Sequence, residues 1–248
     1  MGTAVFLAAG VMAFGAGCLA RSRYERDCLV TEEYRIASEK IHGQGKTIVF
    51  LTDLHNKEFG EENSRLLETV RKVKPDAVLF GGDGMVAKRG NSDVRIPLAL
   101  LTELAKEFPV YCGNGNHESR MLWKSEIYGE TYENYRTALE NAGIRYLSNE
   151  AADLDSDIRI YGLDLPKSAI CRGRERSLRV FEGDSGRAGP EKFCLLLAHS
   201  PLFFEEYAAW GADLTLSGHF HGGTIRLPLV GGVMTPQYQF FIRAARDI

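Results

Sequence analysis

The stretch Thr47-Ile48-Val49-Phe50-Leu51-Thr52-Asp53-Leu54-His55 decides the fold, because an uninterrupted apolar run ends directly in an acidic residue and a histidine. An apolar run of this length predicts a buried strand. Carboxylate and imidazole are ligands that divalent transition metals prefer. The stretch therefore predicts a strand that carries candidate metal ligands at its carboxyl end.

The same arrangement recurs four more times along the chain. Residues 77–80 lead into Asp83, residues 110–112 into Asn116, residues 193–197 into His199, and residues 214–216 into His219. Ligands at the carboxyl ends of neighbouring strands converge on one rim of a sheet, where open α/β folds place their sites. We therefore expect one site built from five strands.

Five of the six histidines fall in these blocks, and only His42 lies outside them. Each block alone is weak evidence, since His-x-His and Gly-Asp are common in turns. All five blocks occur together, in the order that a two-metal hydrolase needs, and this makes a metal site the leading interpretation. The blocks are Asp53-Leu54-His55, Gly82-Asp83, Gly115-Asn116-His117-Glu118, His199 and Gly218-His219-Phe220-His221.

The remaining pattern indicates a single α/β domain. Apolar residues at helical spacing over 66–73 stop before Pro75, and a right-handed crossover then places Asp53 and Asp83 on neighbouring parallel strands. Further helices are expected over 96–108 and 131–142, and an alternating strand over 158–162. A chain of 248 residues, 44% of them hydrophobic, can bury one large core.

Composition excludes several function classes. A net charge of -3 argues against a nucleic-acid binder, and no Gly-x-Ser-x-Gly, P-loop or His-Glu-x-x-His motif occurs. The five cysteines are odd in number and lack Cys-x-x-Cys spacing, so reduced thiols are expected. Cys112 and Cys194 lie in apolar runs and are interpreted as core residues.

The uncharged segment Thr3–Ala20 favours a membrane anchor or uncleaved signal over a soluble helix, and we expect the protein at the cell membrane. The arginines that follow it would keep the domain cytoplasmic, but no positive charge precedes it, so the side of the membrane stays open. We expect an anchor over residues 1–20, a connector with a strand around Tyr34-Arg35-Ile36 over 21–45, and the catalytic domain over 46–248.

At these blocks the sequence resembles the calcineurin-like metallophosphoesterases, most closely their bacterial membrane-associated branch, which includes phosphodiesterases and enzymes acting on a UDP-linked diacylglucosamine. The likeness runs from about Tyr34 to Gln239. It implies a four-layer fold, a β-sandwich flanked by helices. Relatives continue through further strands after a Thr-Pro like Thr235-Pro236, so the last C-terminal strands are expected to be missing here.

The resemblance also implies roles for individual residues. Asp83 would bridge two divalent ions, with Mn the first expectation and Fe or Zn the alternatives. Asp53, His55 and His221 would complete one site, and Asn116, His199 and His219 the other. His117 would face the phosphate as electrostatic stabiliser or proton donor.

One departure from the family concerns His117. The family usually has Gly-Asp-x-x-Asp, where the last carboxylate orients this histidine, but that position is Val86 here. Without such a partner His117 loses the group that fixes its tautomer. Glu118 is the candidate replacement.

The expected function is hydrolysis of a phosphodiester or pyrophosphate with two metal ions. A water that bridges the ions would be activated and would attack phosphorus in line with the leaving group. A small or lipid-linked phosphoester or a sugar nucleotide is the expected substrate, and the oligomeric state stays open. The alternative is a membrane-anchored, metal-binding scaffold with little turnover. The segment Ser168–Pro190, which includes Arg172, Arg174, Arg176 and Arg179, favours a solvated surface insert over a flap that binds a second phosphate.

Overall fold

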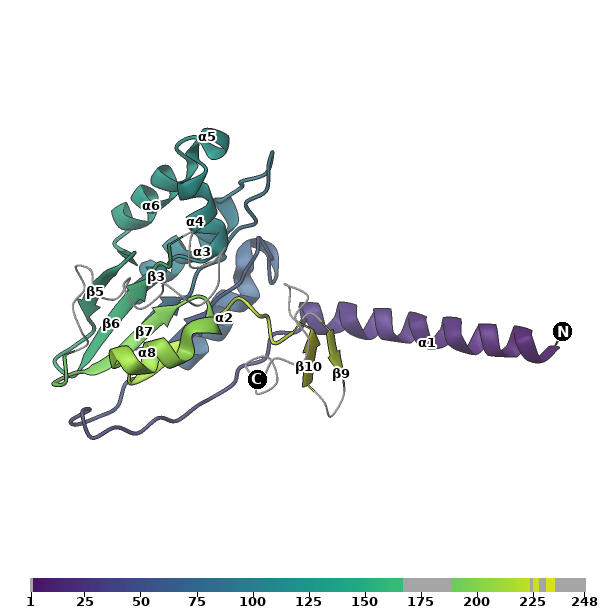
Figure 1. Ribbon diagram of the computed structural model, residues 1–248, viewed down its shortest axis with the longest axis horizontal. Helices are drawn as coiled ribbons and strands as arrows, with labels where there is room; N and C mark the ends of the chain where they lie inside the picture. Colours follow the sequence, from purple (N-terminus) through teal and green to yellow (C-terminus); the bar gives the residue numbers. More distant parts are fainter. Residues whose placement is uncertain (1, 167–188, 224, 228–230, 235–248) are drawn as a thin grey trace.

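Two four-stranded sheets form the centre of the molecule (Figure 1). The computed structural model describes residues 2–166, 189–223, 225–227 and 231–234. Two predictions fall mostly or wholly outside these residues. They concern the Ser168–Pro190 segment and the C-terminal strands that are expected to be missing after Thr235-Pro236.

The first sheet is entirely parallel, in the order β1-β2-β3-β4. Its strands are β1 (Ile48–Leu51), β2 (Ala77–Phe80), β3 (Val110–Gly113) and β4 (Arg145–Leu147). The connections carry η1 (Glu61–Asn63), α2 (Ser64–Val73), α3 (Arg95–Ala105), α4 (Asn116–Trp123), α5 (Ser125–Tyr128) and α6 (Thr131–Asn141). Parallel neighbours require such crossovers, which deliver every strand end to the same edge of the sheet.

The second sheet has the order β5-β6-β7-β8, with β5 antiparallel to β6 and the other pairs parallel. Its strands are β5 (Glu150–Asp153), β6 (Ile158–Leu163), β7 (Phe193–Ala198) and β8 (Leu214–Leu216). Between β7 and β8 lie η3 (Pro201–Phe203) and α8 (Phe204–Trp210). A separate antiparallel pair consists of β9 (Ile225–Leu227) and β10 (Gly231–Met234).

Alternating side chains build the layers, because successive residues of a strand point to opposite faces. In β2, Val78 and Phe80 pack with residues of α2, α3 and α6, whereas Ala77 and Leu79 pack with residues of the second sheet. In β7, Cys194, Leu196 and Ala198 pack with Phe203, Tyr207 and Trp210 of the η3–α8 segment. The four-layer α/β sandwich expected from the sequence is therefore confirmed.

Most expected elements form close to their predicted bounds, but one strand does not. The region around Tyr34-Arg35-Ile36 has no regular structure, and Tyr34 and Ile36 are 72% and 52% exposed. The prediction of a strand there was wrong. Among the described residues no strand lies beside this short alternating segment, and pairing with a neighbouring strand is what stabilises an extended segment of this length.

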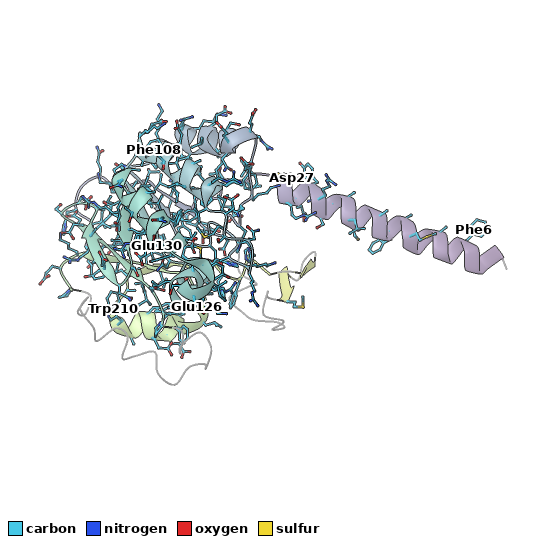
Figure 2. All side chains as sticks on the ribbon, turned by 90° about the horizontal axis from the view of Figure 1, so that it is seen from above. Phe6, Asp27, Phe108, Glu126, Glu130 and Trp210 are labelled. Carbon is cyan, nitrogen blue, oxygen red and sulfur yellow. The ribbon has the colours of Figure 1, made fainter. Side chains whose placement is uncertain are left out.

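Helix α1 (Gly2–Asp27) extends away from the domain as one continuous element (Figures 1 and 2). The exposed side chains along it include Phe6, Met12, Phe14 and Leu19. In the part of the chain that the structure describes, no helix combines the length and apolarity needed to cross a membrane. The expectation of a transmembrane helix is therefore not supported.

Candidate metal centre

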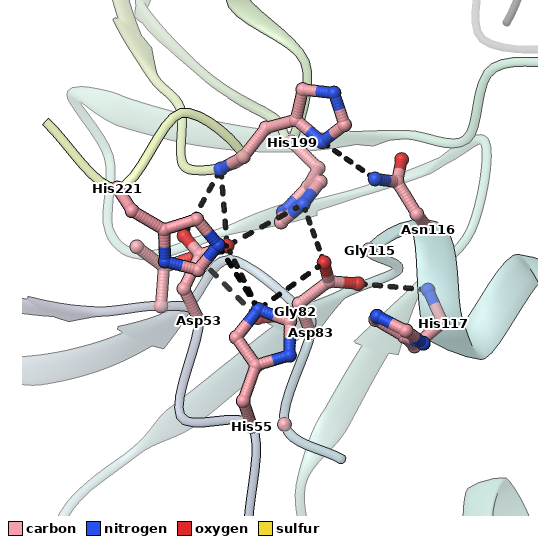
Figure 3. A network of polar contacts seen from close by, with 12 residues as sticks. Asp53, His55, Gly82, Asp83, Gly115, Asn116, His117, His199 and His221 are labelled. Carbon is pink, nitrogen blue, oxygen red and sulfur yellow. Dashed lines mark hydrogen bonds and ion pairs between the residues drawn. The ribbon is translucent and has the colours of Figure 1, made fainter. Parts of the chain in front are cut away.

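Every sequence-predicted ligand lies just beyond the carboxyl end of a strand. Asp53 and His55 follow β1, Asp83 follows β2, and Asn116 begins α4 after β3. From the second sheet, His199 follows β7, and His219 and His221 follow β8. Figure 3 shows the side chains of Asp53, His55, Asp83, Asn116, His199 and His221 gathered at one place.

One group of ligand atoms comes from Asp53, His55 and His221. The Nε2 atoms of His55 and His221 are 3.2 Å apart, and they lie 3.7 and 3.6 Å from Asp53 Oδ1. The three side chains offer ligand atoms within 4.8 Å of one another, close enough to surround one cation.

A second group comes from Asp83, His199 and His219, whose ligand atoms also lie within 4.8 Å of one another. Asn116 Nδ2 contacts His219 Nδ1 and so brings the amide to this group. The two groups are contiguous, because Asp83 Oδ2 lies 3.7 Å from His55 Nε2 and 3.2 Å from His199 Nε2. Asp83 thus stands between the two groups, within 3.7 Å of a histidine from each.

His199 provides the clearest sign that a cation belongs here. Its Nδ1 donates a hydrogen bond to the Gly81 carbonyl oxygen at 2.8 Å, because a carbonyl can only accept. Its Nε2 is buried, makes no well-aligned hydrogen bond among the described residues, and faces Asp83 Oδ2 at 3.2 Å. An unsatisfied buried polar atom is costly, and an imidazole held through Nδ1–H with a bare Nε2 is the usual form of a metal-bound histidine. The donor set therefore fits a divalent ion.

The pKa shifts in the cluster also indicate a site suited to a cation. Burial opposes charge on Asp83, but the close contact with His199 and the positive charges of His199 and His117 hold the pKa of this carboxyl well below its usual range. Burial likewise works against a charged His199, yet Asp83 and Asp53 raise its pKa to about 9. Burial and the neighbouring His199 lower the pKa of His219 to about 4. Without a metal, a proton on His199 offsets the two carboxylates.

The backbone at this site is strained. Asp53, His55, Asp83, His219 and His221 all have positive φ angles between 48° and 74°. Such conformations cost free energy in residues with side chains and concentrate at functional sites. Gly218 shows why glycine is needed beside them, because a Cβ atom there would collide with the Asp53 carboxylate.

Glu118 lies at the site but does not orient His117. Its carboxylate accepts hydrogen bonds from the backbone N–H groups of Asp83, Gly84 and Gly115 at 2.8 to 3.0 Å. Burial and the charge of Asp83 raise the pKa of Glu118 to about 7. Glu118 therefore ties the Asp83 loop to the start of α4, and the expectation that it replaces the missing carboxylate at Val86 was wrong.

Sequence reasoning missed a polar cluster behind α4. Asp164 accepts hydrogen bonds from Asn114 Nδ2 at 2.8 Å and from Ser119 Oγ at 2.7 Å. Asn114 also contacts the hydroxyls of Tyr132 and Tyr146. Asp164 directly follows β6, so it carries the same signal as the predicted ligands, an acidic residue at the carboxyl end of a strand.

A two-sheet α/β sandwich that gathers histidines, aspartates and an asparagine at its strand ends defines the class of metal-dependent hydrolases. The sequence profile of the family described as "Calcineurin-like phosphoesterase" matches residues 46–223. The chain therefore belongs to the calcineurin-like phosphoesterase family, and it is a metal-dependent phosphoester hydrolase.

Relatives that the chain spans over 70% or more of their own length support this assignment. The chain is 29% identical over 241 residues to "Uncharacterized metallophosphoesterase YkuE" of Bacillus subtilis, covering 94% of this chain and 78% of that protein. It is 31% identical over 211 residues to "Phosphodiesterase YaeI" of Escherichia coli, covering 82% and 70% of the two chains. An uncharacterized metallophosphoesterase of Aquifex aeolicus is 28% identical over 214 residues, covering 83% and 75%.

Proposed function

We propose that the protein hydrolyses a phosphodiester or pyrophosphate bond with two divalent ions, one in each group of ligands. The observation that carries the proposal is the position of Asp83, whose Oδ2 lies within 3.7 Å of a histidine from each group. A pair of ions bound there would supply an activated water and neutralise charge on the phosphoryl group.

The side chains of the site have distinct tasks in this proposal. Asp53 and Asp83 would hold the ions by charge, while the backbone N–H of His219 fixes Asp53 at 3.0 to 3.1 Å and that of His117 fixes Asp83 at 2.8 Å. His117 would donate a hydrogen bond to the phosphoryl group. We propose Mn as the ion, with Fe or Zn as alternatives, because imidazole-rich sites favour these over Mg or Ca.

We propose a lipid-linked phosphoester or a sugar nucleotide as substrate, acted on at the cell membrane. The support is α1, which carries exposed Phe6, Met12, Phe14 and Leu19 away from the domain. Sedimentation with phospholipid vesicles tests this, comparing the wild type with a Phe6→Ser/Phe14→Ser variant. A matched Ile127→Ser/Phe204→Ser variant removes exposed apolar side chains from the domain instead. Equal sedimentation of all three proteins would contradict the membrane proposal.

The enzymatic proposal is tested by hydrolysis of bis-p-nitrophenyl phosphate, a diphosphate ester and a monoester after reconstitution with each metal. We expect Mn-dependent turnover of the diester or diphosphate ester. The rate should fall by more than about 100-fold in Asp83→Asn, which exceeds the effect of replacing a residue that only supports a metal ligand. Asp153→Asn is the matched control, because Asp153 pairs with Lys192 on the surface. Two bound ions with no turnover of any substrate would instead support the metal-binding scaffold.

A further inference from the structure

His117 has an unusual set of partners around Nδ1. The backbone N–H of Ala87 donates to His117 Nδ1 at 2.9 Å. Arg120 Nη1, which carries two hydrogens, lies 3.3 Å from the same nitrogen and donates to the Ala87 carbonyl at 2.9 Å. Both neighbours of Nδ1 are therefore N–H donors.

This arrangement fixes where the imidazole proton sits. A guanidinium and a backbone amide have no acceptor to offer, so Nδ1 must present its lone pair to them. A hydrogen on Nδ1 would point at the Ala87 hydrogen. In the neutral ring the proton therefore belongs on Nε2, the nitrogen left for the site.

His117 is placed so that this proton is useful. Its ring meets the His55 ring edge-on, with centroids 5.2 Å apart, and one of its nitrogens lies within 4.8 Å of ligand atoms of His55 and Asp83. Ala87 is fully buried, so water competes poorly for the bond that holds the ring.

The hydrogen bond to His117 Nδ1 runs in the opposite direction from the one that a carboxylate at position 86 would form. A carboxylate would accept a hydrogen bond from Nδ1–H and so leave Nε2 of the neutral ring without a proton. Here Val86 offers no polar group, and the following amide donates instead. The replacement thus changes which nitrogen carries the hydrogen.

We infer that Arg120 is a positioning residue, which clamps the Ala87 amide against His117 and holds that ring as an Nε2–H donor toward the phosphoryl group. The part that concerns the phosphoryl group rests on the proposed function; the tautomer does not. Arg120 acts through both of its bonds, since its guanidinium holds the Ala87 carbonyl and faces Nδ1 at once.

Nitrogen NMR of histidine-labelled, zinc-loaded protein at mildly alkaline pH tests the tautomer directly, with the His117 signal identified by its absence in His117→Asn. We expect a protonated Nε2 and an unprotonated Nδ1 in the wild type, and a mixture of tautomers in Arg120→Met. Arg136→Met is the matched control, because this half-buried arginine pairs with Glu140 and Glu150 away from the site. A protonated Nδ1 in the wild type would overturn the inference, as would an Arg120→Met spectrum identical to that of Arg136→Met.

Kinetics provide the second readout on the same variants. We expect kcat of Arg120→Met to fall about 10-fold with little change in KM, the scale for groups that orient a functional histidine, and Arg136→Met to match the wild type. Equal kcat in the two variants would overturn the role of Arg120 in turnover. If no variant hydrolyses any phosphoester, the proposed function fails, whereas the NMR result still decides the tautomer.

Discussion

The Nε2 atom of His199 lies 3.2 Å from Asp83 Oδ2, and the opposite nitrogen of the same ring is bonded to the Gly81 carbonyl. The contact joins the carboxyl end of β2 in one sheet to the carboxyl end of β7 in the other. A proton or a metal can occupy this junction, but not both, because each needs the same lone pair on Nε2. The pH dependence of both stability and metal affinity follows from that competition.

The first prediction concerns pH. The pKa of His199 is raised to about 9 in the metal-free protein, so the stabilisation from its protonation is present below the unfolded pKa of about 6.5 and is lost as pH rises toward 9. Metal affinity should rise over the same window, since the ion displaces that proton. Urea unfolding of chelator-treated protein should therefore show falling stability from pH 6.5 to 9, while metal titrations show tighter binding. If the stability of the metal-free protein and the metal affinity both rose, or both fell, between pH 6.5 and 9, the proton and the metal would not compete for His199.

The second prediction concerns Gly218. A Cβ atom at this position collides with the Asp53 carboxylate, so Gly218→Ala should displace Asp53 and lower metal occupancy while the fold is retained. The matched control is Gly113→Ala, where the nearest atom to an added Cβ is Leu197 Cβ at an ordinary 3.7 Å. Elemental analysis of both purified variants, with circular dichroism for the fold, gives the answer. Equal metal content would show that Asp53 does not need its present position.

The third prediction concerns Glu118. Replacing it with glutamine turns one of the acceptor oxygens for the Asp83, Gly84 and Gly115 amides into a donor. A buried amide left without an acceptor costs about 1 to 3 kcal/mol, so the free energy of unfolding of Glu118→Gln should fall by that amount. Glu68→Gln is the control, since Glu68 forms an exposed pair with Lys72. Denaturant titrations that give the two variants equal stability would contradict this role.

The fourth prediction concerns the cysteines. Burial raises the pKa of Cys194 to about 12 and also raises that of Cys112, whereas Cys18 is exposed. Because the thiolate is the reactive form, a thiol reagent should label Cys18 in the native protein and label Cys112 and Cys194 only after unfolding. Mass mapping of the labelled sites measures this. Rapid native labelling of Cys194 would mean that β7 is not held in the core.

Sequence alone was sufficient to predict the strands that carry the ligands. The apolar runs before Asp53 and Asp83 became neighbouring parallel strands, of which β2 is fully buried and β1 half-buried. The strand expected around Tyr34 failed for lack of a pairing partner, which local alternation cannot reveal. Local patterns thus predict that a strand can form but not whether another strand lies beside it.

The side chains that gather at the strand ends could be predicted from the sequence, but the groups that hold them in place could not. Asp83 and His199 stand out by residue type, whereas the support of His117 comes from the backbone of Ala87 and from Arg120, and neither has a distinctive sequence signal. Positive φ angles at the ligands are equally invisible, because they arise from the tertiary approach of loops from different strands. Asp164 could have been found, had every acidic residue at a strand end been considered.

Anomalous diffraction from crystals of the Mn-loaded protein tests the central claim most directly. The account predicts two Mn peaks, one among Asp53, His55 and His221 and the other among Asp83, His199 and His219, with Asp83 contacting both. A single peak, or two peaks elsewhere in the molecule, would contradict it.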